Sequence, residues 1–377
     1  MNKVKPHSLL KIQTKKNFNL CVLSIQSPYI CKKISKMTPI TYQNISLKPY
    51  NTFGIDVKAR YLCLYEKPSD LQHFITKGPL LRDVEMIILG GGSNQLFTRD
   101  FEGVIIHPVN KNIKVISEDA DYVCVKADAG VTWDNLVAYA VENNWGGIEN
   151  LSDIPGDVGA SAVQNIGAYG VEAKDCILEV NLVSFADAST RTLLNAECQF
   201  DYRSSIFKNK FRNRYLIDSV TFKLTKKHKF ITHYGSVSEE LKKFDALNLK
   251  NIRQAIINIR SSKLPNPKEI GNGGSFFKNP LVSEYLLEKL RNDYPEIPSY
   301  PATNDMVKLA AGWLIEQCGL KGYMNPKQTA GIHDKQALVI VNKGNASGME
   351  IVDVARLVQN KVYEKFDVCL EPEVIIN

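Results

Sequence analysis

The stretch Ile87-Ile88-Leu89-Gly90-Gly91-Gly92-Ser93-Asn94 runs from a hydrophobic strand directly into glycines and small polar residues. Successive backbone N–H groups in such a turn form a concave anion site suited to a pyrophosphate. The stretch is not the G-x-G-x-x-G of a Rossmann unit, because Gln95 occupies the place of the third glycine and no helical pattern follows. By itself it fits a tight turn at the end of a strand equally well.

A second segment of small residues, IPGDVGASAVQNIGAYG, spans positions 154–170. Its composition permits close approach of a flat, extended ligand, and Gln164 and Asn165 could hydrogen-bond the edge of a ring. The alternative is a tightly packed loop between domains. Two such segments, separated by a predicted strand and a predicted helix, together favour a nucleotide cofactor.

The third glycine-rich segment, GNGGSFFKNP at positions 271–280, places one hydroxyl, Ser275, directly behind three glycines. Glycines allow the backbone to approach a ligand closely, although most glycine turns are only turns. Phe276 and Phe277 distinguish this segment from a flexible linker, because they predict an apolar contact that holds the turn in place. We therefore consider Ser275 a candidate functional residue.

Composition places the chain among soluble proteins of two or three domains, with 377 residues and no apolar run of membrane-spanning length. The net charge of +7 is misleading, since residues 1–36 hold eight lysines and no Asp, Glu or Arg. The remainder carries 39 of the 47 basic residues against all 40 acidic ones and is nearly neutral, so a nucleic-acid partner is not expected. The eight cysteines form no C-x-x-C pair and no Cys/His cluster, which argues against a metal site or a disulfide framework and fits a reducing cytosol.

The lysine-rich leader lacks a clear cleavage site for a secretory signal, and an organelle transit segment would normally be rich in Arg. We hypothesise that it is either a disordered tail or an upstream extension of a gene whose true start is Met37. Intact-mass measurement of the native protein distinguishes the two.

Hydrophobic periodicity predicts a mixture of strands and helices. The predicted strands cover 55–65, 85–89, 122–127, 215–224, 337–341 and 368–376, and a further strand has Leu178, Val180 and Leu182 in alternation. The predicted helices cover 133–143, 251–259, 285–290 and 306–318. A last helix opens with the capping box Ser347 to Glu350 and has one apolar stripe formed by Ile351, Val354, Ala355, Val358 and Val362.

Seven motifs occur in an order that resembles one enzyme family: NTFG (51–54), GGGSN (90–94), IPG (154–156), QNIGAYG (164–170), YRSSIFK (202–208), GSFFKNP (274–280) and EPEV (371–374). From about residue 40 onward the chain is similar to UDP-N-acetylenolpyruvoylglucosamine reductases, in the branch with a substrate-covering tyrosine loop. The resemblance implies an α+β fold, with a two-part FAD-binding unit of the vanillyl-alcohol-oxidase type and a C-terminal α+β substrate-binding domain. It departs from the family pattern at Gly91, where an acidic residue is often found, and in ending at Asn377.

The implied domains are a leader (1–38), a first FAD-binding subdomain (39–106, completed by 367–377), a second (107–264) and a substrate-binding domain (265–366). The family reaction reduces UDP-N-acetylglucosamine enolpyruvate to UDP-N-acetylmuramate in peptidoglycan precursor synthesis. NADPH reduces non-covalently bound FAD, and flavin N5 then delivers hydride to the enolpyruvyl ether, leaving negative charge that can delocalise into the carboxylate. That step needs cationic or hydrogen-bonding groups on the carboxylate and an acid at the carbanion.

Carried over by motif, Ser275 is the proton donor, and Arg203 and Glu373 support the developing enolate. The implied FAD contacts are Gly90, Gly91, Gly92, Ser93, Asn94, Pro155, Gly156, Ser161, Asn165, Ile166 and Gly167. The implied substrate contacts are Tyr234, Lys263 near the diphosphate, Asn279 and Glu316. Without the family context, Arg203 reads as a surface residue and Glu373 as an ordinary strand carboxylate.

Two other functions stay open. One is a different FAD-linked oxidase or dehydrogenase on the same scaffold, and the other is an inactive sugar-nucleotide sensor. In the leading interpretation the protein is a cytoplasmic monomer that binds a sugar nucleotide and NADPH, with no metal, no nucleic acid and no membrane insertion.

Overall fold

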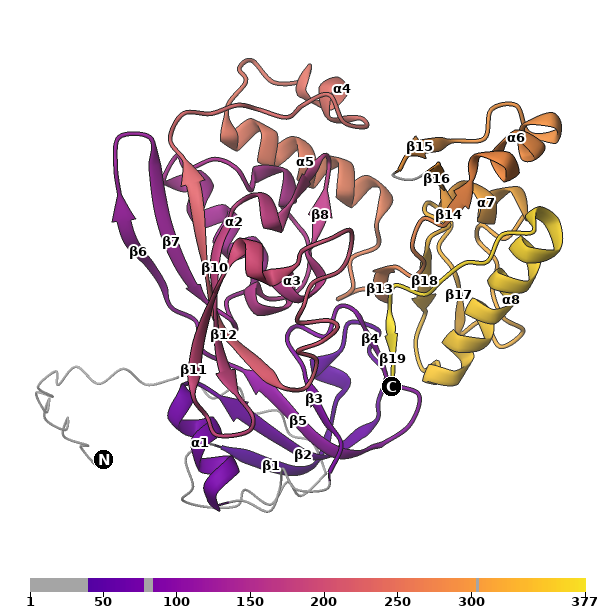
Figure 1. Ribbon diagram of the computed structural model, residues 1–377. Helices are drawn as coiled ribbons and strands as arrows, with labels where there is room; N and C mark the ends of the chain where they lie inside the picture. Colours follow the sequence, from indigo (N-terminus) through magenta and orange to yellow (C-terminus); the bar gives the residue numbers. More distant parts are fainter. Residues whose placement is uncertain (1–39, 78–83, 303–304) are drawn as a thin grey trace, which may run out of the picture. The chain divides into compact units, whose positions relative to one another are not determined.

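The computed structural model describes residues 40–77, 84–302 and 305–377 (Figure 1). The predicted leader at 1–38, including the hypothesis of a start at Met37, lies outside the described residues. Within the described ranges, no helix is both long enough and apolar enough to cross a membrane.

The first sheet has four strands in the order β1-β2-β5-β3. Its strands are β1 (Thr41–Ser46), β2 (Lys58–Tyr65), β5 (Phe101–Pro108) and β3 (Met86–Ile88), with helix α1 (Pro68–Lys77) following β2. Strand β5 is parallel to both β2 and β3 and is almost wholly buried. Burial on both faces is typical of strands in parallel sheets. Strand β3 leads into the glycine turn at 90–94, as the sequence predicts.

The second sheet is antiparallel, in the order β11-β10-β12-β7-β6. Its strands are β11 (Thr190–Leu194), β10 (Ile177–Ser184), β12 (Tyr215–Thr225), β7 (Tyr122–Asp128) and β6 (Ile113–Glu118). Helices α2 (Trp133–Glu142) and α3 (Val158–Gln164) lie between β7 and β10 in the chain. Helices α4 (Val237–Leu241) and α5 (Leu249–Lys263) follow β12. Trp133 of α2 lies edge-on to Phe222 of β12, with ring centroids 5.7 Å apart, and both side chains are fully buried. Helix α2 therefore packs its apolar stripe on this sheet.

The alternation predicted for Leu178, Val180 and Leu182 in β10 fails at Leu178. A register shift between Ile177 and Glu179 interrupts the pairing with β12. Ile177 is consequently buried, whereas Leu178 is 39% exposed. An irregularity of this kind changes which side chains share a face, and a periodicity of two cannot reveal it.

The C-terminal part contains two three-stranded sheets, β13-β18-β17 and β14-β16-β15. Their strands are β13 (Gly271–Ser275), β18 (Val339–Asn342), β17 (Ala330–Ile332), β14 (Leu281–Ser283), β16 (Met306–Leu309) and β15 (Ser299–Pro301), and the helices are α6 (Glu284–Asp293), α7 (Ala311–Gln317) and α8 (Gly348–Phe366). The capping box of α8 is confirmed, and all five residues of its predicted apolar stripe are buried.

The helix predicted for 306–318 is wrong over its first turn. Residues 306–309 form β16, which pairs with β14 on one side and β15 on the other. Helix α7 begins only at Ala311, whose N–H is capped by Asn279 Oδ1 at 3.1 Å. Strand pairing thus overrides a local helical pattern here.

The last predicted strand, 368–376, is also too long. Only β19 (Ile375–Ile376) is a strand, and it pairs in parallel with β4 (Gln95–Leu96), directly after the glycine turn. Val368, Leu370 and Val374 are buried without belonging to a strand. The apolar residues that suggested a strand therefore pack into the core from an irregular segment that contains Pro372, which has no N–H to donate.

Gly92 should be the least replaceable glycine of the turn. Its φ is +64°, and a Cβ there would collide with the carbonyl oxygen of Tyr50. Gly235 is a matched control, because its φ of +58° is similar but no atom lies within 4 Å of the added Cβ. In urea unfolding we expect Gly235→Ala to cost about 1 kcal/mol from backbone strain alone, and Gly92→Ala at least about 3 kcal/mol because steric overlap is added. Equal losses would contradict the assignment of Gly92 to a close backbone contact.

Candidate functional site

The glycine turn at 90–94 packs directly against the loop that contains Pro155 and Gly156. A Cβ at Gly91 would lie 3.1 Å from Gly156 Cα, and a Cβ at Gly156 would lie 3.1 Å from Ser93 Oγ, so a side chain at either position would crowd this contact. Ser93 Oγ donates to the carbonyl oxygen of Pro155 at 3.2 Å. Residues from the first and second predicted FAD segments are thus brought together.

A cavity of about 250 Å³ opens beside this contact. Its lining includes the whole turn 90–94, Gln164 at the end of α3, Lys208, Arg212 and Tyr215. Backbone N–H groups of a glycine turn and cationic side chains are the donors that a dinucleotide's phosphates require. The residues present therefore fit the pyrophosphate portion of FAD.

Arg203 and Glu373 meet although they are far apart in the sequence. Arg203 Nε lies 3.2 Å from Glu373 Oε1, and the two side chains are only 20% and 17% exposed. Gln164 Nε2 donates to the same Glu373 oxygen at 2.9 Å. Arg203 is therefore not a surface residue, and Glu373 is not an ordinary strand carboxylate, because it lies outside the strands and is paired with Arg203.

The loop that carries Arg203 is held by the segment 165–167. Arg203 Nη2 donates to the carbonyl oxygen of Gly167 at 2.6 Å, and its backbone has a positive φ of 54°, which is uncommon for a residue other than glycine. Asn165 is fully buried and donates to the carbonyl oxygen of Asp201 at 2.9 Å. The Asn165 side chain is thus engaged in shaping the Arg203 loop, and it has little capacity left for a flavin ring edge.

The other predicted FAD residues of this segment also form internal contacts. Ser161 Oγ donates to the carbonyl oxygen of Val158 at 2.7 Å, and Ile166 N–H donates to the carbonyl oxygen of Ser161. Both Ser161 and Val158 are buried. These residues can contribute to a cofactor site through shape and backbone groups.

Ser275 is the last residue of β13 and is exposed. The next residue, Phe276, accepts a hydrogen bond at its carbonyl oxygen from Glu373 N–H at 2.8 Å, and Phe276 and Phe277 are buried as predicted. Ser275 therefore lies one residue from the backbone contact with Glu373. Among the described residues, the Ser275 hydroxyl makes no hydrogen bond, so it is free to act on a ligand.

A second cation adds positive charge to this cluster. Lys208 Nζ donates to Gln164 Oε1 at 2.7 Å and to the carbonyl oxygen of Arg203 at 3.0 Å. Burial, together with the charge of Lys278, lowers the pKa of Lys208. Two cations, Arg203 and Lys208, thus stand beside one carboxylate, Glu373, and the surplus positive charge suits an anionic ligand.

The four predicted substrate residues have no contact with the Arg203–Glu373 pair among the hydrogen bonds and ion pairs of the described residues. Tyr234 is 50% exposed and lies against Gly170, where a Cβ would be 3.4 Å from its ring. Lys263 is the exposed last residue of α5. Asn279 caps α7 through its Oδ1, and Glu316 forms an exposed ion pair with Lys321 at 2.8 Å. Their proposed substrate contacts stay predictions.

Comparison with known proteins identifies the family. Residues 80–193 match the family model for an FAD binding domain, and residues 266–377 match that for the C-terminal domain of UDP-N-acetylenolpyruvoylglucosamine reductase. The reductase of that name from Flavobacterium johnsoniae is 46% identical over 88% of this chain and 98% of its own length. The chain belongs to the UDP-N-acetylenolpyruvoylglucosamine reductase family. Its relative from Chromobacterium violaceum is also 46% identical, over 88% of this chain and 98% of its own length.

A solved structure supports the fold. The reductase of Thermus caldophilus, at 21% identity, covers 88% of this chain and 97% of its own, with a TM-score of 0.62. The predicted fold class, an FAD-binding unit followed by a C-terminal α+β substrate-binding domain, is confirmed. The domain boundaries and the roles of individual residues stay predictions.

Two residues of the site, Lys208 and Asp157, are not expected from any sequence pattern, and Gln164 is expected only at the edge of a ring. Gln164 and Lys208 lie within recognised motifs, but no local pattern indicates that one amide would join Lys208 to Glu373. Asp157 Oδ2 would lie 3.2 Å from a Cβ at Gly90, so this carboxyl faces the glycine turn. Burial raises the pKa of Asp157 to about 6.

The raised pKa of Asp157 predicts a pH-dependent contribution to stability. Because the folded protein favours the neutral carboxyl, the contribution is full below about pH 4 and is lost as pH rises through about 6. A difference of about two pH units corresponds to about 3 kcal/mol. For the cofactor-free protein we expect the unfolding free energy of the wild type to fall by up to about this amount, relative to Asp157→Asn, between pH 4 and pH 7. Parallel pH profiles in urea titrations would contradict the assignment.

Proposed function

We propose that Ser275 donates the proton, and that Arg203 and Glu373 stabilise the developing enolate, in the reduction of UDP-N-acetylglucosamine enolpyruvate to UDP-N-acetylmuramate. The chain is an FAD-dependent oxidoreductase of peptidoglycan precursor synthesis, with NADPH as hydride donor. The observation that carries these roles is the partly buried ion pair between Arg203 and Glu373. The N–H of Glu373 also donates to the carbonyl oxygen of Phe276, the residue after Ser275.

Positive charge beside the enolpyruvyl carboxylate is the first requirement of the reaction. Arg203 is fixed by the carbonyl oxygen of Gly167 and by Glu373, so its guanidinium needs little reorganisation when charge develops on the substrate. Lys208, held through Gln164, adds a second positive charge nearby. Glu373 keeps Arg203 oriented while leaving the cluster with a net positive charge.

Proton delivery to the substrate carbon is the second requirement. A serine hydroxyl is a weak acid, but the carbon of an enediolate is basic enough for a well-placed hydroxyl to protonate it. Ser275 has no competing hydrogen bond among the described residues, and Gly274 before it adopts a φ of +70°. Phe276 and Phe277, buried directly behind it, fix the end of the strand.

FAD would lie against the turn 90–94 and the loop that contains Pro155 and Gly156, with 161–167 shaping the remaining wall. When bound, it supplies the hydride that NADPH replenishes. Asn165 and Ser161 would support the site through their internal hydrogen bonds, which set the backbone around it.

The sugar nucleotide would extend from this centre toward Tyr234, Lys263 and Asn279, with Glu316 nearby. Lys263 would meet the diphosphate, since an exposed cation at the end of α5 suits that charge. We further propose that the protein is a cytoplasmic monomer. Because the chain beyond residue 36 is nearly neutral, we expect it not to bind nucleic acid.

Anaerobic flavin spectroscopy tests the reaction. The purified protein should be yellow, should bleach with NADPH, and should regain its colour when the enolpyruvyl sugar nucleotide is added. A colourless protein that cannot be reconstituted with FAD would exclude the proposal. Rapid oxygen consumption without the enolpyruvyl substrate would instead favour an oxidase, and tight UDP-sugar binding without turnover would favour a sensor.

Replacing Ser275 separates its catalytic role from a structural one. We expect Ser275→Ala to leave flavin reduction by NADPH intact and to slow reoxidation by substrate at least about 100-fold, because general acid catalysis is worth about that much. Ser189→Ala, at an exposed position of the connection between β10 and β11, serves as the control and should change neither half-reaction. Equal loss of both half-reactions in Ser275→Ala would show that the residue is structural.

A further inference from the structure

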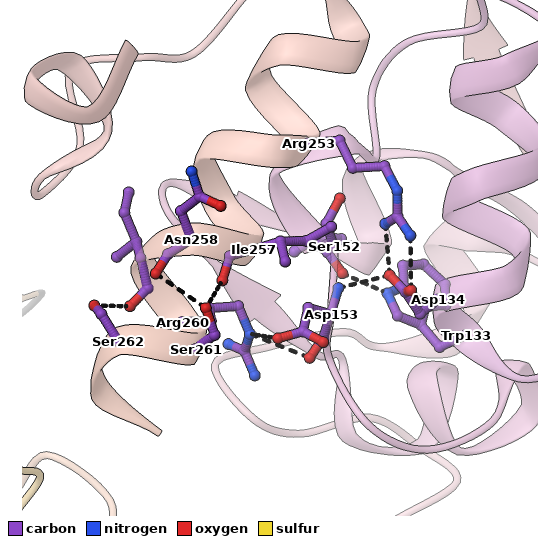
Figure 2. Close-up of polar contacts among 12 residues, drawn as sticks. Trp133, Asp134, Ser152, Asp153, Arg253, Ile257, Asn258, Arg260, Ser261 and Ser262 are labelled. Atoms are coloured by element: carbon purple, nitrogen blue, oxygen red, sulfur yellow. Dashed lines mark hydrogen bonds and ion pairs between the residues drawn. The ribbon is translucent and has the colours of Figure 1, made fainter. Parts of the chain in front are cut away.

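Helix α5 carries two arginines of nearly equal burial but unequal pairing. The Arg253 side chain is 17% exposed and the Arg260 side chain 14%. Arg253 donates through both terminal nitrogens to the two oxygens of Asp134, at 2.6 and 2.7 Å (Figure 2). Such a bidentate pair satisfies a buried guanidinium well.

Arg260 is only partly satisfied. Its Nε donates to the carbonyl oxygen of Asp153 at 3.2 Å and lies 3.6 Å from the carboxylate of the same residue, whose side chain is 48% exposed (Figure 2). Neither Nη atom of Arg260 makes a hydrogen bond to any described residue. The Arg260 side chain as a whole keeps 14% of its surface exposed.

The electrostatics of the two arginines follow this difference in pairing. The hydrogen bond to Asp134 raises the pKa of Arg253, whereas burial lowers the pKa of Arg260 in spite of Asp153. A buried charge is costly unless it is fully paired. Arg260 thus has a more distant counter-charge in Asp153, at 3.6 Å, than Arg253 has in Asp134, at 2.6 Å.

The surroundings of Arg260 belong to the region proposed for the sugar nucleotide. Tyr169 packs on the apolar face of α5 and acts electrostatically on Arg260. The next residue, Gly170, lies against Tyr234. Lys263 follows Arg260 by three residues on α5, so the two cations lie on the same side of the helix.

We propose that Arg260 is a phosphate-binding residue whose two Nη atoms donate to a phosphate group of a bound nucleotide. Asp153 acts as a positioning residue, because its carbonyl oxygen and carboxylate hold Nε and turn the free edge of the guanidinium away from themselves. That edge matches two phosphate oxygens, and a lysine could not reproduce this geometry. The proposal rests on the proposed function for the identity of the nucleotide, which could be the sugar nucleotide, NADPH or FAD.

The test compares Arg260→Gln and Arg260→Lys with Arg253→Gln in the FAD-loaded enzyme. A charged hydrogen bond to phosphate accounts for roughly 10- to 100-fold in affinity. We expect Arg260→Gln to raise the KM for one nucleotide by this factor with kcat changed less than about threefold, and Arg260→Lys to recover only part of the loss. Arg253→Gln should lower the unfolding temperature and leave both KM values within about threefold of the wild type.

Three readouts distinguish the sources of the phosphate. Selective weakening of UDP binding in calorimetry assigns it to the sugar nucleotide, weakening of NADP+ binding assigns it to NADPH, and faster loss of FAD on dialysis assigns it to the flavin's pyrophosphate. Each supports the proposal. Since UDP and NADP+ binding require no turnover, they test Arg260 even if the enolpyruvyl substrate is not reduced, a result that would count only against the proposed function.

Two results would overturn the proposal. One is that Arg260→Gln binds all three nucleotides as tightly as the wild type. This result counts against the proposal even if the variant shifts the reduction potential of the flavin. The other is an equal loss of nucleotide binding in Arg260→Gln and Arg253→Gln, which would assign both arginines to stability.

Discussion

Glu373 is the residue on which the geometry of the site depends. Its N–H donates to Phe276, next to Ser275, and its carbonyl oxygen accepts from Asn94 Nδ2 in the glycine turn at 3.2 Å. Its carboxylate binds Arg203 and Gln164. A single residue therefore links the glycine turn, the strand of Ser275 and the loop of Arg203. Backbone and side chain together make these contacts, so replacing the carboxylate alone would leave part of the linkage intact.

Much of the site could be predicted from the sequence because its chemistry is concentrated in short motifs. Glycines at 90–92 and at 271, 273 and 274 indicate close backbone approach, and aromatic residues directly behind Ser275 indicate a fixed turn. Phe276 and Phe277 are buried as expected, and Gly92, Gly271 and Gly273 approach other parts of the chain closely, whereas their approach to a ligand stays a prediction. The capping box of α8 could be predicted for the same reason, since the two residues that form it are separated by only three positions.

The parts that could not be predicted depend on contacts between distant segments. Residues 306–309 are strand because two other strands pair with them, and Leu178 is exposed because of an irregular register with β12. The pattern of either segment alone does not contain that information. Likewise, Asn165 has the chemistry of a ligand-binding amide, yet Asp201, 36 residues away, takes up its hydrogen bond. The different pairing of Arg253 and Arg260 also depends on which acidic residue the fold places opposite each.

The pairing of β4 with β19 has a consequence for the order of events during folding. The turn that opens at residue 90 is completed by contacts with Glu373 and Ile375, and the Asn94–Glu373 bond spans 279 residues. Contacts of such long sequence separation form late, because the loop between them must first be closed. A nascent chain can build the first sheet early, but it cannot complete the wall of the cavity until residues 373–376 have been made. We therefore expect the flavin to bind near the end of folding. It can then stabilise only a chain in which residues 90–96 and 373–376 are already in contact.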